Sequence, residues 1–232
     1  MSYVHHFVFG IYPYIALVIF LVGSLIRFDR EQYTWKSDSS QLLRRGQLRL
    51  GSNLFHIGIL MLFVGHFVGL LTPKALYHAL GLSTESKQML AIIAGGVFGS
   101  MCLIGLLLLV HRRLAEPRIR ATSTRMDIFI LLWILATLLL GLVSIVVSLG
   151  HRDGAVMVQL GLWAQHIVTF RPGAADFIAG VSGVYKAHLV FGMTLFVLFP
   201  FSRLVHVWSG FAAAGYVARP YQIVRSRAPR MP

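Results

Sequence analysis

The stretch that decides the fold is residues 50–71, LGSNLFHIGILMLFVGHFVGLL, in which apolar side chains run almost without interruption. A bilayer core of about 30 Å is crossed by roughly 20 mainly apolar residues in an α-helix. Residues 50–71 therefore predict a transmembrane helix. This helix carries two histidines, His56 and His66, at depths where no water would solvate an imidazole.

Similar apolar segments lie on both sides of this one, and each is long enough to cross a membrane. They span residues 3–26, 89–110, 127–149 and 184–208. We therefore expect an all-α integral membrane protein of five transmembrane helices. Residues 1–232 would form a single domain that ends in a short cytoplasmic tail.

The composition supports a membrane protein and excludes several soluble classes. Apolar residues make up 56% of the chain and charged residues 12%, about half the charged share of a soluble domain. The single cysteine, Cys102, excludes an intrachain disulfide and a cysteine-ligated metal cluster. We expect it to be a small buried apolar residue.

The basic residues are divided unequally between the two sides of the membrane. Of 21 Lys and Arg residues, 16 lie in residues 27–49, in residues 111–126 and from residue 203 onward. With five helices these three regions share one side, and the positive-inside rule makes that side the cytoplasm. We expect a periplasmic N-terminus, a cytoplasmic C-terminus and a multi-pass location in the inner membrane. The net charge of +13 therefore does not indicate nucleic-acid binding.

Four histidines within two helices are the strongest functional signal. His56 and His66 lie in the second predicted helix, and His188 and His206 in the fifth. Ionisable residues inside a membrane are costly and mark functional sites. Because these two helices are antiparallel, His56 should face His206 and His66 should face His188. Each pair could hold one haem iron between two neutral imidazoles.

The spacing of the histidines predicts an irregular fifth helix. His56 and His66 are separated by about 15 Å of helix, and His188 and His206 by about 27 Å. Pro200 lies between the latter two and is expected to kink the helix. In a straight helix the eighteen-residue gap would put both rings on one face. Glycines 58, 65, 69 and 192 flank the histidines and would admit a macrocycle, although ordinary helix packing explains small residues equally well.

Other interpretations of the histidines stay open at this point. Each could be a structural residue hydrogen-bonded to a neighbouring helix. A zinc site is less suitable because neither helix supplies a compact group of thiolates or carboxylates. A non-redox membrane anchor or transporter with structural histidines is therefore the alternative from another class.

Two haems with two histidine ligands each would favour one-electron transfer, since no iron position is left for a substrate. A membrane quinol is the expected donor at the outer haem, with Lys87 as the candidate residue that bonds to its oxygen. A lysine at the membrane interface is the alternative. Arg112 and Arg203, at cytoplasmic helix ends, are candidates to pair with haem propionates, although the positive-inside rule also explains them.

Several longer motifs carry a family resemblance. They are SNLFHIGIL (52–60), VGHF (64–67), PRIRATST (117–124) and GMTLFVLFPFSRLVHVW (192–208). These segments resemble the gamma subunit of membrane-bound respiratory nitrate reductase, a diheme cytochrome b. The resemblance extends from the first helix to about residue 225. Departures lie mainly in residues 75–87, in residues 150–180 and in the C-terminal tail.

The resemblance implies specific roles for the candidate residues. His56 and His206 would hold a proximal haem b, and His66 and His188 a distal haem b. Lys87 matches the family's functional lysine beside a quinol site. The implied partners are an iron–sulfur beta subunit and a molybdenum-cofactor alpha subunit that reduces nitrate. A dimer of heterotrimers, or a related diheme cytochrome b of another respiratory reductase, is left open.

Overall fold

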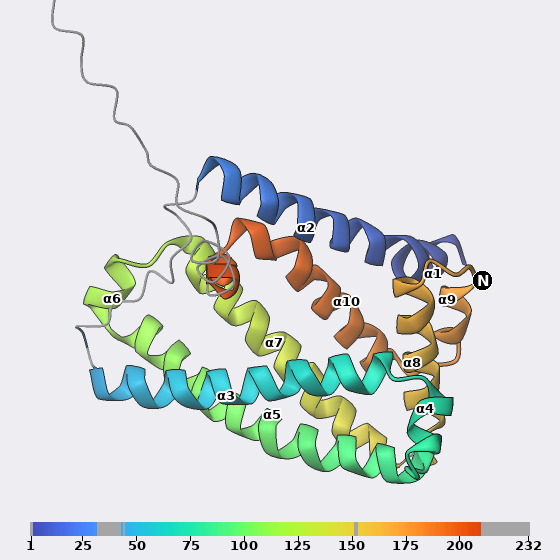
Figure 1. Ribbon diagram of the computed structural model, residues 1–232. Helices are drawn as coiled ribbons and strands as arrows, with labels where there is room; N and C mark the ends of the chain where they lie inside the picture. Colours follow the sequence, from blue (N-terminus) through green and yellow to red (C-terminus); the bar gives the residue numbers. More distant parts are fainter. Residues whose placement is uncertain (1, 32–42, 44, 151–152, 210–232) are drawn as a thin grey trace, which may run out of the picture.

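The computed structural model describes residues 2–31, 43, 45–150 and 153–209 (Figure 1). Five helices in this part are long and apolar enough to cross a membrane, which confirms the predicted fold class. The spans are Tyr3–Arg30, Arg45–Leu71, Thr84–Ala115, Arg125–Ser148 and Gly183–Phe201. No strand occurs among the described residues. The C-terminal tail from residue 210 and part of the first basic connection lie outside them.

The first four spans extend further toward the basic end than the apolar pattern alone predicted. The first comprises α1 (Tyr3–His6), a π-helical turn (Phe7–Ile11) and α2 (Tyr12–Arg30). The next three are α3 (Arg45–Leu71), α5 (Thr84–Ala115) and α7 (Arg125–Ser148). Their extensions carry arginines: Arg30, Arg45 and Arg49 are exposed, whereas Arg112 and Arg113 of α5 are buried. Thr124 and Asp127 form a capping box that begins α7.

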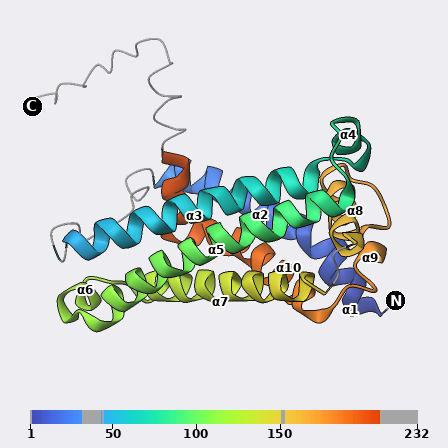
Figure 2. The same cartoon turned by 90° about the horizontal axis from the view of Figure 1, so that it is seen from below.

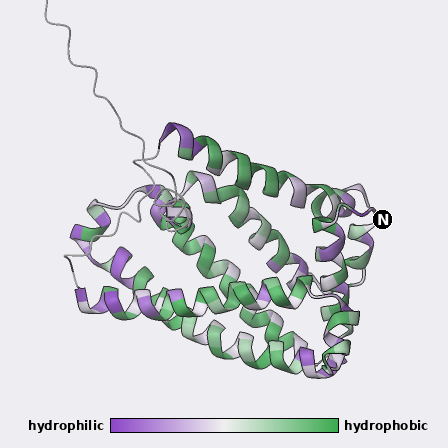
Figure 3. Ribbon diagram, in the orientation of Figure 1, coloured by the Kyte–Doolittle hydropathy of each residue, from purple (hydrophilic) through white to green (hydrophobic). Residues whose placement is uncertain are grey.

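The helices pack as a chain of neighbours. α3 packs along α5, α5 on α7, α7 on α10 (Gly183–Leu198), and α10 on α2. Apolar residues dominate the length of the spans, and hydrophilic residues gather toward their ends (Figure 3). This distribution is the one expected of a bundle surrounded by lipid.

Short helices occupy the two ends of the bundle. α6 (Pro117–Ala121) lies at the arginine-rich end, whereas α4 (Lys74–Ala79), α8 (Ala155–Val168) and α9 (Ala174–Phe177) lie beside the N-terminus at the other end (Figure 2). No helix was predicted between the spans 127–149 and 184–208, and α8 corrects this prediction. At 14 residues α8 is too short to cross the bilayer. It packs against α3 instead.

The last span corrects the expected continuous helix over 184–208. α10 ends at Leu198, and two 3₁₀ turns follow, Phe199–Phe201 and Arg203–Val205. Pro200 has no backbone N–H and cannot continue the α-helical bonding pattern. Since the helix is interrupted, the eighteen-residue spacing does not place His188 and His206 on one helical face.

The contact of α3 with α5 depends on glycine. A Cβ added at Gly58 would lie 2.6 Å from Cys102 Cβ and 2.7 Å from its backbone N. Cys102 is fully buried, as expected. Gly58 was one of the glycines proposed to admit a macrocycle, and its role is corrected here: it lets two helix backbones approach each other.

Candidate functional site

The structure brings the four intramembrane histidines together in two pairs. The ring centroids of His56 and His206 are 6.3 Å apart, and those of His66 and His188 are 5.9 Å apart. Both pairs join α3 to the last span, and they are the pairs that helix direction predicted. His56 and His66 are ten residues apart on α3, so the pairs lie at depths about 15 Å apart.

All four imidazoles are held in the same tautomer. In each ring Nδ1 lies within hydrogen-bond distance of a backbone carbonyl, which can only accept, so Nδ1 carries the proton and Nε2 keeps its lone pair. The Nδ1 to oxygen distances are 2.7 Å for His56 to Ser52, 2.7 Å for His66 to Leu62, 3.0 Å for His188 to Thr137 and 2.6 Å for His206 to Arg203. A carbonyl bond of this kind orients metal-binding histidines generally.

The separations within the pairs fit a shared iron. Two imidazoles that bind one iron from opposite sides, through bonds of about 2 Å, have ring centroids about 6 Å apart. Each pair therefore offers a donor set suited to a six-coordinate iron.

The surroundings of the rings leave room beside them. A Cβ added at Gly65, Gly69 or Gly192 would meet no heavy atom of the chain within 4 Å. His56 and His66 are themselves exposed on α3 although they lie within an apolar span. An imidazole facing hydrocarbon is costly without a partner. The open glycines and exposed rings thus fit a large planar group between the helices.

Lys87 lies in the first turn of α5, which begins at Thr84 and not at residue 89 as predicted. Its Nζ donates a hydrogen bond to the carbonyl of Gly69, 2.9 Å away, one turn beyond His66 on α3. The same Nζ lies 4.1 Å from the ring centroid of Tyr77, a buried residue of α4. Lys87 and Tyr77 line a pocket together with Gly69, Thr72, Lys74, Met157, Val158, Gly161, Leu162 and Gln165.

Lys87 and Gln165, two residues that line this pocket, donate hydrogen bonds to backbone carbonyls at the end of α3. In a continuing helix the Gly69 carbonyl would accept from the N–H of residue 73, but Pro73 has none. Lys87 bonds to that carbonyl, and Gln165 Nε2 on α8 donates to the carbonyl of Leu70 at 3.0 Å. Sequence reasoning missed Gln165. The sequence signal for Gln165 is that it is a polar residue within an apolar segment. Nothing in the sequence indicates that it lies near the end of α3.

Arg112 and Arg203, proposed to bind haem propionates, bond to protein groups. Arg112 is buried and donates from Nη2 to the carbonyl of Leu43 at 2.7 Å. Arg203 donates from Nε to Asp127 Oδ1 at 2.8 Å. Both arginines therefore have partners within the chain, and the propionate role stays a prediction. Sequence reasoning missed Asp127, which is the acidic residue in the first turn of α7.

The comparisons with known proteins agree with the family resemblance. Residues 5–227 match the family model described as nitrate reductase gamma subunit. The chain is 52% identical over 227 residues to the respiratory nitrate reductase 1 gamma chain of Escherichia coli K12, covering 98% of this chain and 100% of the relative. It is 49% identical over 227 residues to the respiratory nitrate reductase 2 gamma chain of the same strain, covering 98% and 99%.

A more distant relative extends the agreement. The nitrate reductase gamma chain of Bacillus subtilis 168 is 38% identical over 219 residues, covering 94% of this chain and 97% of the relative. Five apolar spans and full-length matches indicate a multi-pass membrane subunit of an electron-transporting oxidoreductase complex. This chain belongs to the nitrate reductase gamma subunit family.

Proposed function

We propose that this chain is the diheme cytochrome b of its nitrate reductase complex and that it oxidises quinol. The observation that carries the proposal is the two histidine pairs at different depths, whose ring centroids lie 6.3 and 5.9 Å apart, about the distance expected when two imidazoles share one iron. The full-length match to the gamma subunit family supports it.

The four histidines are the residues that would hold the two haems b. His56 and His206 would hold the proximal haem, and His66 and His188 the distal one. Iron bound by two histidines has no open coordination position, and its chemistry when bound is one-electron transfer. The chain's part would be to keep each Nε2 unprotonated, which the four carbonyl bonds at Nδ1 favour.

The Lys87 pocket is our candidate for the quinol site. An ammonium group has three N–H donors, so Lys87 can keep its bond to Gly69 and donate another to a quinol oxygen. The pocket lies one helical turn from His66, and therefore next to the distal pair. Its apolar residues, Met157, Val158 and Leu162, suit the ring and tail of a lipid-soluble quinol.

The overall reaction balances without an added reductant. A quinol gives up two electrons and two protons to become quinone, and nitrate takes up two electrons and two protons to become nitrite and water. α4 and α8, which supply residues to the pocket, lie at the end of the bundle that holds the N-terminus (Figure 1). With that end in the periplasm, protons leave outside while electrons move inward, and membrane potential grows.

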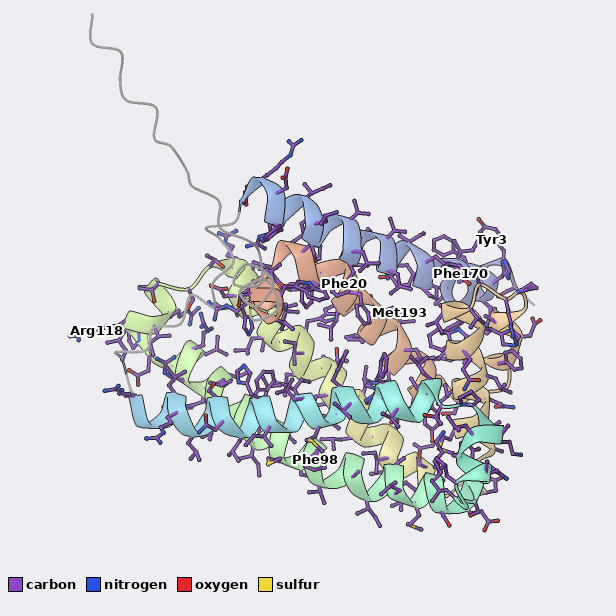
Figure 4. All side chains as sticks on the ribbon, viewed as in Figure 1. Tyr3, Phe20, Phe98, Arg118, Phe170 and Met193 are labelled. Carbon is purple, nitrogen blue, oxygen red and sulfur yellow. The ribbon has the colours of Figure 1, made fainter. Side chains whose placement is uncertain are left out.

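The partners would dock at the opposite, arginine-rich end. The iron–sulfur beta subunit would receive the electrons there, and the molybdenum-cofactor alpha subunit would reduce nitrate in the cytoplasm. Arg118 of α6 projects from this end (Figure 4). The positive-inside rule favours this end as cytoplasmic and the inner membrane as the location.

The competing functions predict different behaviour. A cytochrome of another respiratory reductase would copurify without a molybdenum protein, and family membership argues against it. A non-redox anchor would keep all activity when His66 is replaced.

The test uses the complex purified from its native membrane. Addition of a reduced quinol analogue should reduce b-type haem, seen as absorbance change, and added nitrate should reoxidise it with formation of nitrite. In sealed vesicles the quinol-facing side should acidify. A complex that forms nitrite from quinol without any b-haem absorbance would overturn the proposal.

A further inference from the structure

The interruption of the last span leaves backbone groups without their α-helical partners. The strap, residues 199–205, joins α10 to His206 and is not α-helical. One side of it packs against the bundle: Pro200, Ser202 and Val205 are buried, while Phe201 is exposed. Carbonyls freed by a broken helix in an apolar environment need donors from elsewhere. The strap therefore has to be held by neighbouring side chains.

The first holding group comes from α2. Arg27 donates from Nη1 to the carbonyl of Pro200 at 2.7 Å and to that of Ser202 at 2.9 Å. One turn earlier, a Cβ added at Gly23 would lie 2.8 Å from Pro200 Cγ. Glycine thus lets α2 approach the strap closely enough for the guanidinium to reach both carbonyls.

Aromatic packing keeps α2 at this position. The ring of Phe20, one helical turn before Gly23, points toward the last span (Figure 4). It packs edge-on against Phe196 and Phe199, with ring centroids 5.1 and 4.8 Å apart. The contacts of Phe20 with Phe196 and Phe199 therefore help to fix the position of Arg27 relative to the strap.

The second holding group comes from the start of α7. Asp127 Oδ1 accepts from Arg203 Nε at 2.8 Å, and Asp127 Oδ2 accepts from the N–H of Thr124 at 3.0 Å and lies 3.8 Å from Arg113 Nη1. The Asp127 carboxylate thus ties the end of the strap to the α7 terminus. Both partners are largely buried, and charge-assisted bonds in such surroundings are strong.

The held segment orients a histidine. His206 Nδ1 donates to the carbonyl of Arg203 at 2.6 Å, so the ring takes its direction from the residue that Asp127 holds. His188 is oriented differently, by the carbonyl of Thr137 in the regular helix α7. Displacement of the strap should therefore turn the ring of His206 and leave that of His188 in place.

We propose that Arg27 and Asp127 are positioning residues for His206, which clamp the strap from two sides and fix the angle of one histidine pair only. This inference rests on the proposed function, because it concerns the geometry of the proximal haem ligands. A purely structural role would lower stability and disturb both pairs alike.

The experiment compares Arg27→Gln, Asp127→Asn and Arg27→Lys with Arg30→Gln, an exposed control on α2. Low-spin ferric haem signals are recorded by electron paramagnetic resonance on the purified complexes, and the two midpoint potentials are titrated. His56→Ala and His188→Ala assign each signal to its pair. We expect Arg27→Gln and Asp127→Asn to shift the largest g value and the potential of the His56–His206 centre alone. Arg27→Lys should shift the g value and the potential of that centre less than Arg27→Gln does.

Each outcome decides a different question. Two unchanged signals in both Arg27→Gln and Asp127→Asn, or equal shifts of both signals, would overturn the clamp while leaving the proposed function intact. Absence of two low-spin signals in the wild-type complex would overturn the proposed function itself. If Arg27→Gln does not assemble, Asp127→Asn and Arg27→Lys provide the same comparison.

Discussion

Gly141 of α7 lies directly against the ring of His188: a Cβ at residue 141 would be 2.9 Å from the His188 Cε1 atom. The glycine leaves a slot for the imidazole, and the Thr137 carbonyl one turn away binds its Nδ1. The ring of the outer pair is therefore fixed by the backbone of a neighbouring helix.

Gly141→Ala should disturb the outer pair specifically. Overpacking a buried contact costs about 1–3 kcal/mol, and the ring can escape only by leaving its position opposite His66. Haem content per chain should fall from two toward one, measured as pyridine haemochrome against protein. Gly96→Ala is the control, because a Cβ there meets nothing within 4 Å. Two haems retained in Gly141→Ala, with both spectra unchanged, would show that the slot is not required.

Lys87→Ala should weaken quinol binding without removing haem. Hydrogen bonds to charged groups are worth about 1.5–3 kcal/mol, so KM for a reduced quinol analogue should rise about tenfold to a hundredfold. Haem content should stay at the wild-type value. Lys186→Ala is the matched control, since Lys186 does not line this pocket and its Nζ donates to the Ala179 carbonyl. An unchanged KM in Lys87→Ala would exclude Lys87 from the quinol site.

Gly58→Ala should destabilise the contact between α3 and α5. The added methyl would collide with the Cys102 backbone, which cannot move as a flexible side chain could. We expect a loss of about 1–3 kcal/mol, measured as a lower thermal unfolding midpoint in detergent. Gly46→Ala on the same helix has open space and should leave the midpoint unchanged or raise it. Equal midpoints for the two variants would contradict the close approach.

The predicted orientation can be measured by labelling. Cys102 is fully buried and provides a silent background for a membrane-impermeant maleimide. In intact spheroplasts Ser2→Cys should react and Arg118→Cys should react only after lysis, because the arginine-rich end is predicted to be cytoplasmic. Reaction of Arg118→Cys before lysis would reverse the topology and the proposed direction of electron flow.

Much of the fold could be predicted because membrane constraints act locally in sequence. The length and apolar character of residues 50–71 predict α3 directly, and the other spans follow in the same way. The pairing of His66 with His188 followed from helix direction, which requires only the number of spans. The histidines' role as ligands stays a prediction that the geometry supports.

What could not be predicted depends on contacts between distant segments. Pro200 indicated a bend, but whether the helix resumes after it depends on Arg27 and Asp127, which bind the strap from other helices. Gln165 became visible as a partner of α3 only when α8 was placed against its end. Likewise, no sequence pattern relates Gly141 to His188.

The most direct test of the account is the haem stoichiometry of the histidine variants. Reduced-minus-oxidised spectra and pyridine haemochrome assays are recorded on the wild-type complex and on the variants His56→Ala, His66→Ala and His111→Ala. His111→Ala is the control, because the His111 ring lies near a helix end and bonds to Gln47. We predict two haems b per chain in the wild type and in His111→Ala. We predict no more than one haem b per chain in His56→Ala and in His66→Ala. The absorbance band that remains should differ between these two variants, because each loses a ligand from a different pair. Two haems retained in either intramembrane variant, or none in the wild type, would contradict the account.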